Sequence, residues 1–265
     1  MSEARLRRVY GAALVALFAA VALARFDLFQ EALRVTLLQL QRGGAIRWKI
    51  LGEVVLFGAI LLLTLRIIPA RIEPRRDALI ALLASGAGWL VEAWGTRAGL
   101  WAYYTRESPP LWIVPVWPLG ALVVDRIAAA FEARFARACD QRRQAALYRC
   151  YCVLFAAVFA GFAFPAGSAL LCAALLAAIL AGLLLRPLPG DVWRVAAGLA
   201  YVFFADFWGT SNGCWSYRPR HAAFSGNAFG ILFGMSLDSA VVMLCLKAVR
   251  WLLRLRGAEP AGGPR

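Results

Sequence analysis

The chain has 265 residues, of which 62% are hydrophobic and 17% charged, and its mean hydropathy is +0.67. A soluble domain is about 45–50% apolar and about 25% charged, so this composition excludes a soluble globular fold. The formal net charge of +14 comes mainly from arginines beside apolar runs, where positive charge orients membrane spans, and we expect no nucleic-acid partner. With one histidine and no Cys-x-x-Cys pair, we expect no metal and no other cofactor.

The first apolar run, residues 9–24, follows a basic segment at residues 5–8. Its end, Ala-Leu-Ala at residues 22–24, is typical of a signal-peptidase site. We favour an uncleaved first span, and a cleaved signal peptide is the alternative. Residues 27–42 mix apolar and polar side chains at helical spacing, which predicts an amphipathic helix in the membrane interface.

Seven further apolar runs predict spans at about residues 49–70, 77–97, 111–129, 148–164, 167–186, 191–211 and 222–248. Asp77 and Asp191 are placed to cap two of these helices. The predicted fold is therefore all-α, a polytopic membrane helix bundle of about eight transmembrane helices. An even number puts both termini on one side, and the segments on that side carry most of the 29 Lys and Arg residues. The positive-inside rule then places both termini in the cytoplasm, in a multi-pass protein of a bacterial-type inner membrane.

A stretch that begins at Glu92 occurs a second time from Asp206, 114 residues later. The identical pairs are Trp94 and Trp208, Gly95 and Gly209, Thr96 and Thr210, Gly99 and Gly213, Trp101 and Trp215, and Tyr103 and Tyr217; the same frame aligns Asp77 with Asp191 and Arg106 with Arg220. Chance likeness between alanine-rich helices does not account for matching Trp, Gly and Tyr. We interpret the pattern as an internal duplication.

The duplication divides the chain into two repeats, residues 1–130 and residues 148–250. A basic cytoplasmic linker at 131–147 joins them, and a disordered tail rich in Pro and Gly follows at 251–265. Three spans separate the two copies of the motif, so the copies run in the same direction. The repeats are then parallel, related by an axis along the membrane normal.

Glu92 and Asp206 are the strongest candidates for chemistry. Each lies five residues before the end of its predicted span, at residues 97 and 211, which is roughly 7 Å below the interface. An ionisable group at such depth is costly and by default faces the bundle interior as part of a functional site. Two carboxyls at one cavity can serve as general acid and general base. The structural alternative is that each acid only ties down its own helix end.

Aromatic residues gather at the same end of the predicted bundle. An aromatic belt at the membrane interface is one explanation. The functional alternative is a cavity whose rings stabilise a cationic intermediate by cation–π attraction, with loop arginines to bind a headgroup or an anionic substrate group. The residues assigned to substrate binding are Trp89, Trp94, Trp101, Tyr103, Phe203, Trp208, Trp215, Tyr217, Arg106, Arg220 and Asp238.

The motif Glu92-x-Trp-Gly-Thr-x-x-Gly-Leu-Trp-x-Tyr-Tyr, followed by Val114-Pro115 and Pro118-Leu119, resembles the carotenoid hydratases of bacteria and archaea. The Phe-Gly step of that family is Leu100-Trp101 here. The duplicated unit is also similar to heterodimer-type lycopene cyclases, although their Pro-x-Glu-Glu signature is absent. The Glu and Asp pair resembles that of the membrane terpene cyclases of meroterpenoid pathways. These resemblances imply Glu92 and Asp206 as acids that protonate an isoprenoid without a cofactor, before ring closure or water capture.

The sequence therefore predicts a membrane-embedded acid–base enzyme, a cyclase or hydratase, that acts on an apolar isoprenoid or terpenoid substrate among the membrane lipids. A proton-coupled transporter of a small molecule or lipid is the main alternative, because duplicated bundles with buried carboxyls also serve transport. A non-catalytic lipid-binding or assembly subunit is the second alternative.

Overall fold

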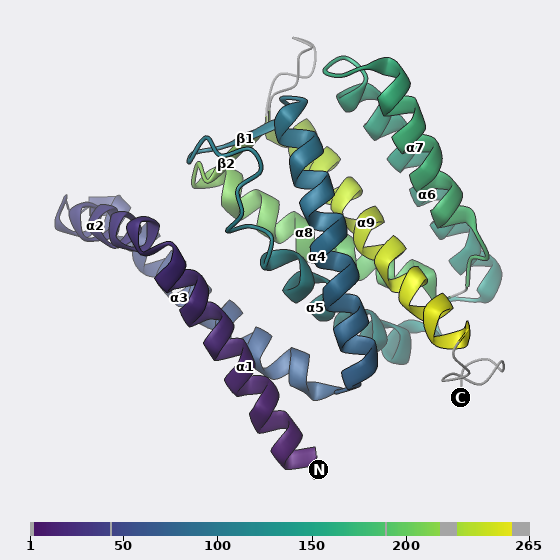
Figure 1. The fold of residues 1–265 in the computed structure, drawn as a ribbon, viewed down its shortest axis with the longest axis horizontal. Coiled ribbons are helices and arrows are strands. Elements are labelled where there is room, and N and C mark those ends of the chain that lie inside the picture. Colours follow the sequence, from purple (N-terminus) through teal and green to yellow (C-terminus); the bar gives the residue numbers. More distant parts are fainter. Residues whose placement is uncertain (1–2, 43, 189, 218–226, 256–265) are drawn as a thin grey trace. The chain divides into compact units, whose positions relative to one another are not determined.

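The computed structural model describes residues 3–42, 44–188, 190–217 and 227–255 of the chain. Most of these residues are helical, and two short strands pair near one end of the bundle (Figure 1). The chain divides into two compact units, Met1–Glu73 and Pro74–Arg265. The predicted all-α class is thereby confirmed.

The first unit contains α1 (Glu3–Ala24), α2 (Phe26–Arg42), α3 (Gly44–Ile67) and the short 3-10 helix η1 (Ile68–Ala70). The predicted interfacial segment is helical as α2. It exposes a set of large apolar side chains, which are Phe26, Phe29, Leu33, Leu37 and Leu38, and it carries an exposed ion pair between Arg34 and Glu31 (2.7 Å). Exposed apolar and charged side chains on one helix are typical of a helix at a membrane surface.

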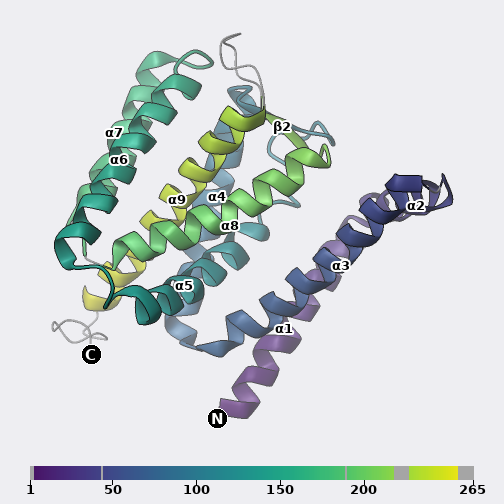
Figure 2. The same cartoon turned by 180° about the vertical axis from the view of Figure 1, so that it is seen from behind.

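The second unit contains α4 (Pro74–Arg97), β1 (Trp101–Tyr103), α5 (Val116–Phe135), α6 (Gln141–Ala163), α7 (Ala169–Leu184), α8 (Asp191–Ser211), β2 (Trp215–Tyr217) and α9 (Asn227–Leu255). Helix α9 is at its centre and contacts α4, α5, α6, α7 and α8. Helices α6 and α7 pair on one side of α9, and α8 crosses it (Figures 1 and 2).

Five helical segments among the described residues are long and apolar enough to cross a membrane: Ala4–Ala24, Ile46–Ala70, Pro74–Arg97, Gln141–Ala163 and Ala228–Leu255. They coincide with five of the predicted spans and indicate a multi-pass membrane protein. Helix α7 is apolar but has only 16 residues, and α5 and α8 each bury charged side chains. The count of eight spans therefore stays a prediction.

Several predicted boundaries shift in the structure. Helix α4 begins at Pro74, before Asp77, because proline suits the first turn of a helix; Asp77 is therefore not its N-cap. Helix α8 begins at Asp191 itself, with Gly190 as N-cap. Helices α5 and α6 extend into the predicted 131–147 linker, and α9 extends to Leu255, inside the segment predicted as a disordered tail.

Buried ion pairs join the helices at the end of the second unit opposite the strands. The guanidinium of Arg76 lies 2.6 Å from Asp125, and that of Arg126 lies 2.5 Å from Asp77, so α4 and α5 are tied together. Asp191 on α8 pairs with Arg250 on α9 at 2.8 Å. Buried charged side chains are stable only when they are paired. Asp125 is therefore a structural residue, and the ion pairs hold α4 against α5 and α8 against α9.

Candidate functional site

Helices α4 and α8 end in the same local structure. Gly99 and Gly213 have φ of +70° and +69°, the left-handed conformation that glycine adopts without strain. In both turns the amide that follows the glycine donates to the carbonyl five residues back, at 2.9 Å after Gly99 and 2.8 Å after Gly213. The glycine amide itself donates to the threonine carbonyl three residues back, at 3.2 Å in each turn. These bonds define a Schellman motif, which reverses the chain and satisfies the helix-terminal carbonyls.

The reversed chain folds an indole back onto its own helix in both copies. A Cβ at Gly95 would lie 1.8 Å from the ring of Trp101, and one at Gly209 would lie 2.0 Å from the ring of Trp215. Only glycine leaves room for such contact. The Trp-Gly-Thr pattern therefore has a local steric reason in each copy.

The two copies then meet as strands. Strands β1 and β2 pair antiparallel, with Trp101 opposite Tyr217 and Tyr103 opposite Trp215. This pairing was not predicted from the sequence. It places β1 and β2 side by side at the ends of α4 and α8 (Figure 1). Rings of the two copies are then in contact, Trp101 with Tyr217 and Tyr103 with Trp215.

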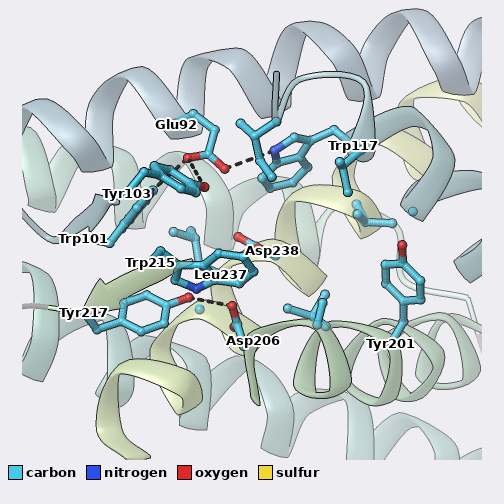
Figure 3. A pocket seen from close by; sticks show the side chains of 17 residues that line it. Glu92, Trp101, Tyr103, Trp117, Tyr201, Asp206, Trp215, Tyr217, Leu237 and Asp238 are labelled. Atoms are coloured by element: carbon cyan, nitrogen blue, oxygen red, sulfur yellow. Dashed lines mark hydrogen bonds between the residues drawn. The ribbon is translucent and has the colours of Figure 1, made fainter. Parts of the chain in front are cut away.

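Glu92 accepts three hydrogen bonds and is 5% exposed. Its Oε2 atom accepts from Trp101 Nε1 at 3.0 Å and from the Tyr103 hydroxyl at 2.9 Å. Its Oε1 atom accepts from Trp117 Nε1 at 3.3 Å (Figure 3). Both oxygens are thus occupied as acceptors, the arrangement that suits an ionised carboxylate.

Asp206 is equally buried but has fewer partners. The Tyr217 hydroxyl donates to its Oδ1 atom at 2.9 Å. Its Oδ2 atom is buried and accepts no hydrogen bond of normal geometry from the described residues, although the indole of Trp215 lies near the carboxyl. The counterpart of Trp117 at the 114-residue offset is Ile231, which has no side-chain N–H. One carboxyl of the pair is therefore fully bonded and the other is not.

Glu92, Asp206 and Asp238 line one cavity in the second unit, with a volume of about 100 Å³ (Figure 3). A cavity needs roughly 10–15 Å³ to hold a water molecule, so this one accepts several water-sized groups. Its aromatic lining residues are Trp101, Tyr103, Trp117, Tyr201, Trp215 and Tyr217. The remaining described lining residues are apolar, and none is Lys, Arg or His. The cavity is thus apolar, aromatic and acidic.

The two strand tyrosines act as hydrogen-bond donors. Burial, and after it the neighbouring Glu92 carboxyl, raises the pKa of Tyr103 well above its usual range. Burial and Asp206 do the same to the pKa of Tyr217. Both phenols therefore stay protonated at neutral pH.

The structure brings together seven of the residues that the sequence assigned to the site, namely Glu92, Asp206, Trp101, Tyr103, Trp215, Tyr217 and Asp238. The other assigned residues that the structure describes do not line the cavity. Trp89 and Phe203 are 41% and 49% exposed, Trp94 stacks on Phe159 with ring centres 5.8 Å apart, and Trp208 and the exposed Arg106 lie elsewhere. Arg220 lies outside the described residues.

Two cavity residues were missed from the sequence, Trp117 and Tyr201. Trp117 lies in the first turn of α5, just after a Val-Pro pair, and donates to Glu92. Tyr201 shares a helical face with Ala205, at i and i+4 spacing. Tyr201 is five residues before Asp206, however, so helical spacing did not link it to the acid in the sequence.

No group of three or more His, Cys, Asp or Glu side chains among the described residues is placed to hold a metal ion. Neither a protein-family model, nor a curated protein, nor a solved structure matches the chain. The likeness to carotenoid and terpenoid enzymes thus stands on the sequence motif alone.

Proposed function

We propose that the chain is a membrane-embedded acid–base enzyme that protonates an apolar, isoprenoid-like substrate and then completes a cyclisation or hydration. The observation that carries the proposal is one aromatic cavity with three carboxyls in different hydrogen-bonding states and no cationic residue among its described lining. Carboxyls that share an apolar site do not all ionise, so the site can hold a proton and release it.

Glu92 and Asp206 take different roles in this proposal. Glu92 is held by three donors and serves as a fixed negative charge. Asp206, with one free oxygen facing the cavity, exchanges a proton. Aromatic faces and a preorganised carboxylate both stabilise positive charge as it develops on a carbon atom.

The lining defines the kind of substrate. A cavity with three acids and no described cation disfavours phosphate and carboxylate groups. Its volume of about 100 Å³ admits the reacting end of a long molecule. Val116, which lines the cavity, is 44% exposed, so the site lies near the outer surface of the second unit, where an apolar chain can remain in lipid.

The parallel-repeat architecture, with eight spans and both termini in the cytoplasm, belongs to the same proposal. Its support is the matched pair of Schellman turns, the matched contacts of indole on glycine, and the pairing of β1 with β2. A duplicated unit that places one carboxyl in each copy is also a simple origin for a two-carboxyl site.

The test is conversion of candidate isoprenoids by cells that express the chain, followed by lipid extraction and mass spectrometry. Wild type should form a product of equal mass or of one added water. Glu92→Gln and Asp206→Asn should reduce turnover by roughly 10²–10⁴-fold and still insert into the membrane. Trp89→Phe, at an exposed position outside the cavity, is the control and should retain turnover. Proton-driven solute uptake without any new lipid species would instead establish the transporter, and full activity in both amide variants would refute the assignment.

A further inference from the structure

Of the three carboxyls that line the cavity, Asp238 is the one without a hydrogen-bond partner among the described residues. It lies on α9, one turn after Gly234, and faces the cavity together with Glu92 and Asp206 (Figure 3). No side chain or backbone group among the described residues donates a hydrogen bond to it or forms an ion pair with it. It is also less buried than the other two acids, because its exposed surface faces the cavity.

Most donors that surround the cavity are already committed. The Tyr201 hydroxyl and the Trp215 indole are the exceptions among the described lining residues, and neither donates to Asp238. Trp101, Tyr103 and Trp117 donate to Glu92, and Tyr217 donates to Asp206 Oδ1. The Tyr151 hydroxyl on α6 donates to the Ser236 carbonyl at 2.9 Å and is not available. The ionisable groups that face the cavity with Asp238 from α4, β1, α8 and β2 are therefore two carboxyls and three phenols, those of Tyr103, Tyr201 and Tyr217. Helix α5 contributes no ionisable lining residue.

An ionised Asp238 would be an unpaired charge in an apolar cavity that already holds the Glu92 carboxylate, which is strongly unfavourable. A protonated Asp238 avoids that cost and becomes a donor, while the Oδ2 atom of Asp206 is an acceptor without a donor. Both groups line the same cavity, and a carboxylic acid that shares an apolar cavity with an unpartnered carboxyl oxygen can share one proton with it.

We infer that Asp238 carries the transferable proton of the site, with Asp206 as its proton-sharing partner and Glu92 as the fixed charge. The inference rests on the proposed function for its catalytic meaning, since it makes Asp238 the general acid. The O–H bond of Asp238 breaks as the electron pair of a substrate C=C forms a new C–H bond, and the neighbouring carbon becomes positive. The Asp206 carboxylate then removes a proton from an adjacent carbon to form a new C=C. Transfer of that proton to Asp238 restores the starting state, and no oxidant or reductant is required.

Infrared spectroscopy of the purified full chain in lipid nanodiscs tests the proton directly, without a substrate. At neutral pH the wild type should show the C=O stretch of a protonated carboxyl, and exchange into deuterium oxide should shift it. Asp238→Asn should remove this band, whereas Glu92→Gln should retain it. Asp140→Asn is the matched control, because Asp140 is an exposed N-cap and asparagine caps helices equally well.

A band that persists in Asp238→Asn, or that disappears in Glu92→Gln, would overturn the inference. If Asp238→Asn does not fold, Asp238→Glu replaces it. The longer carboxyl should shift the band while retaining it, and an unchanged frequency would also overturn the inference. In the conversion assay Asp238→Asn should lose roughly 10²–10⁴-fold in turnover. The two proposals fail separately, because a wild type that converts nothing refutes the enzyme while the infrared result still reports the proton on Asp238.

Discussion

The amide variants of Glu92 and Asp206 should destabilise the fold unequally, because the two carboxyls are bonded differently. In Glu92→Gln the amide oxygen can still accept from Trp101 and Tyr103, which share one oxygen in the wild type. The new NH₂ group then faces the Trp117 N–H, and two donors cannot bond each other. In Asp206→Asn the oxygen keeps the bond from Tyr217, and the NH₂ group takes the place of an oxygen that has no partner.

The magnitudes follow from these bonds. A buried donor left without its acceptor costs about 1–3 kcal/mol, and each bond that changes from a charged to a neutral acceptor loses about 1 kcal/mol. The Trp117 bond is long, at 3.3 Å, so its loss belongs at the lower end of that range. We expect Glu92→Gln to lower the free energy of unfolding by about 3 kcal/mol and Asp206→Asn by about 1 kcal/mol.

Equilibrium unfolding in detergent measures this difference, and a double-mutant cycle with Trp117→Phe assigns it. In the Glu92→Gln background, Trp117→Phe removes the donor clash, so the two substitutions should couple by about 1–2 kcal/mol. Equal losses in the two amide variants, or additive effects of Glu92→Gln and Trp117→Phe, would refute the proposed role of Trp117 in holding Glu92.

Three further predictions test other parts of the structure. A Cβ at Gly234 would lie 1.9 Å from the Tyr217 hydroxyl and 2.4 Å from Asp206 Oδ2. Gly234→Ala should therefore lower the free energy of unfolding by about 1–3 kcal/mol and abolish substrate conversion. Gly86→Ala is the control, because a Cβ there meets open space, and it should change neither quantity. The free energy of unfolding should fall as pH rises above about 10, because tyrosines of the unfolded chain then ionise, while the raised pKa values keep Tyr103 and Tyr217 protonated in the folded state. An unfolding series from pH 9 to 11 should show a smaller decrease of the free energy of unfolding with pH in Tyr217→Phe than in wild type. An equal decrease would contradict the burial of that phenol. Reporter fusions after Glu107 and after Arg137 should read outside and cytoplasmic respectively, and the reverse result would invert the proposed topology.

The sequence was informative where one residue type permits only one explanation. An excess of apolar residues in long runs required membrane helices, and carboxyls within such runs required an interior site. The repeated Gly, Trp and Tyr pointed to a shared local structure, although neither the Schellman turn nor the strand pairing was predicted. The Schellman turn and the strand pairing both depend on which backbone N–H and C=O groups lack a hydrogen bond where the helix ends. Residue spacing alone does not predict this.

Exposure was the feature that the sequence predicted least well. Trp89 and Phe203 share a helical face with the acids by spacing, but they point outward, because a membrane helix can bear apolar residues on every side. Trp117 and Tyr201 were missed for the related reason that one more aromatic in an apolar run carries no signal. In a soluble protein the contrast between polar and apolar helix faces would have distinguished exposed aromatic residues from those that line a cavity.

The two copies of the motif use one backbone structure to hold two carboxyls that are not chemically equivalent. Glutamate at position 92 and the indole of Trp117 give the first copy three donors, whereas aspartate at position 206 and the apolar Ile231 leave the second with an unpartnered oxygen. Two carboxyls with the same hydrogen bonds would have similar proton affinities, so neither would be preferentially ionised. In the proposed function, this difference in bonding makes Glu92 a fixed charge and lets Asp206 exchange a proton. Asp238 lies on α9, which contacts both α4 and α8. Under that proposal, the residues that the two copies of the motif share position the carboxyls, and the residues that differ between the copies determine which carboxyl exchanges a proton.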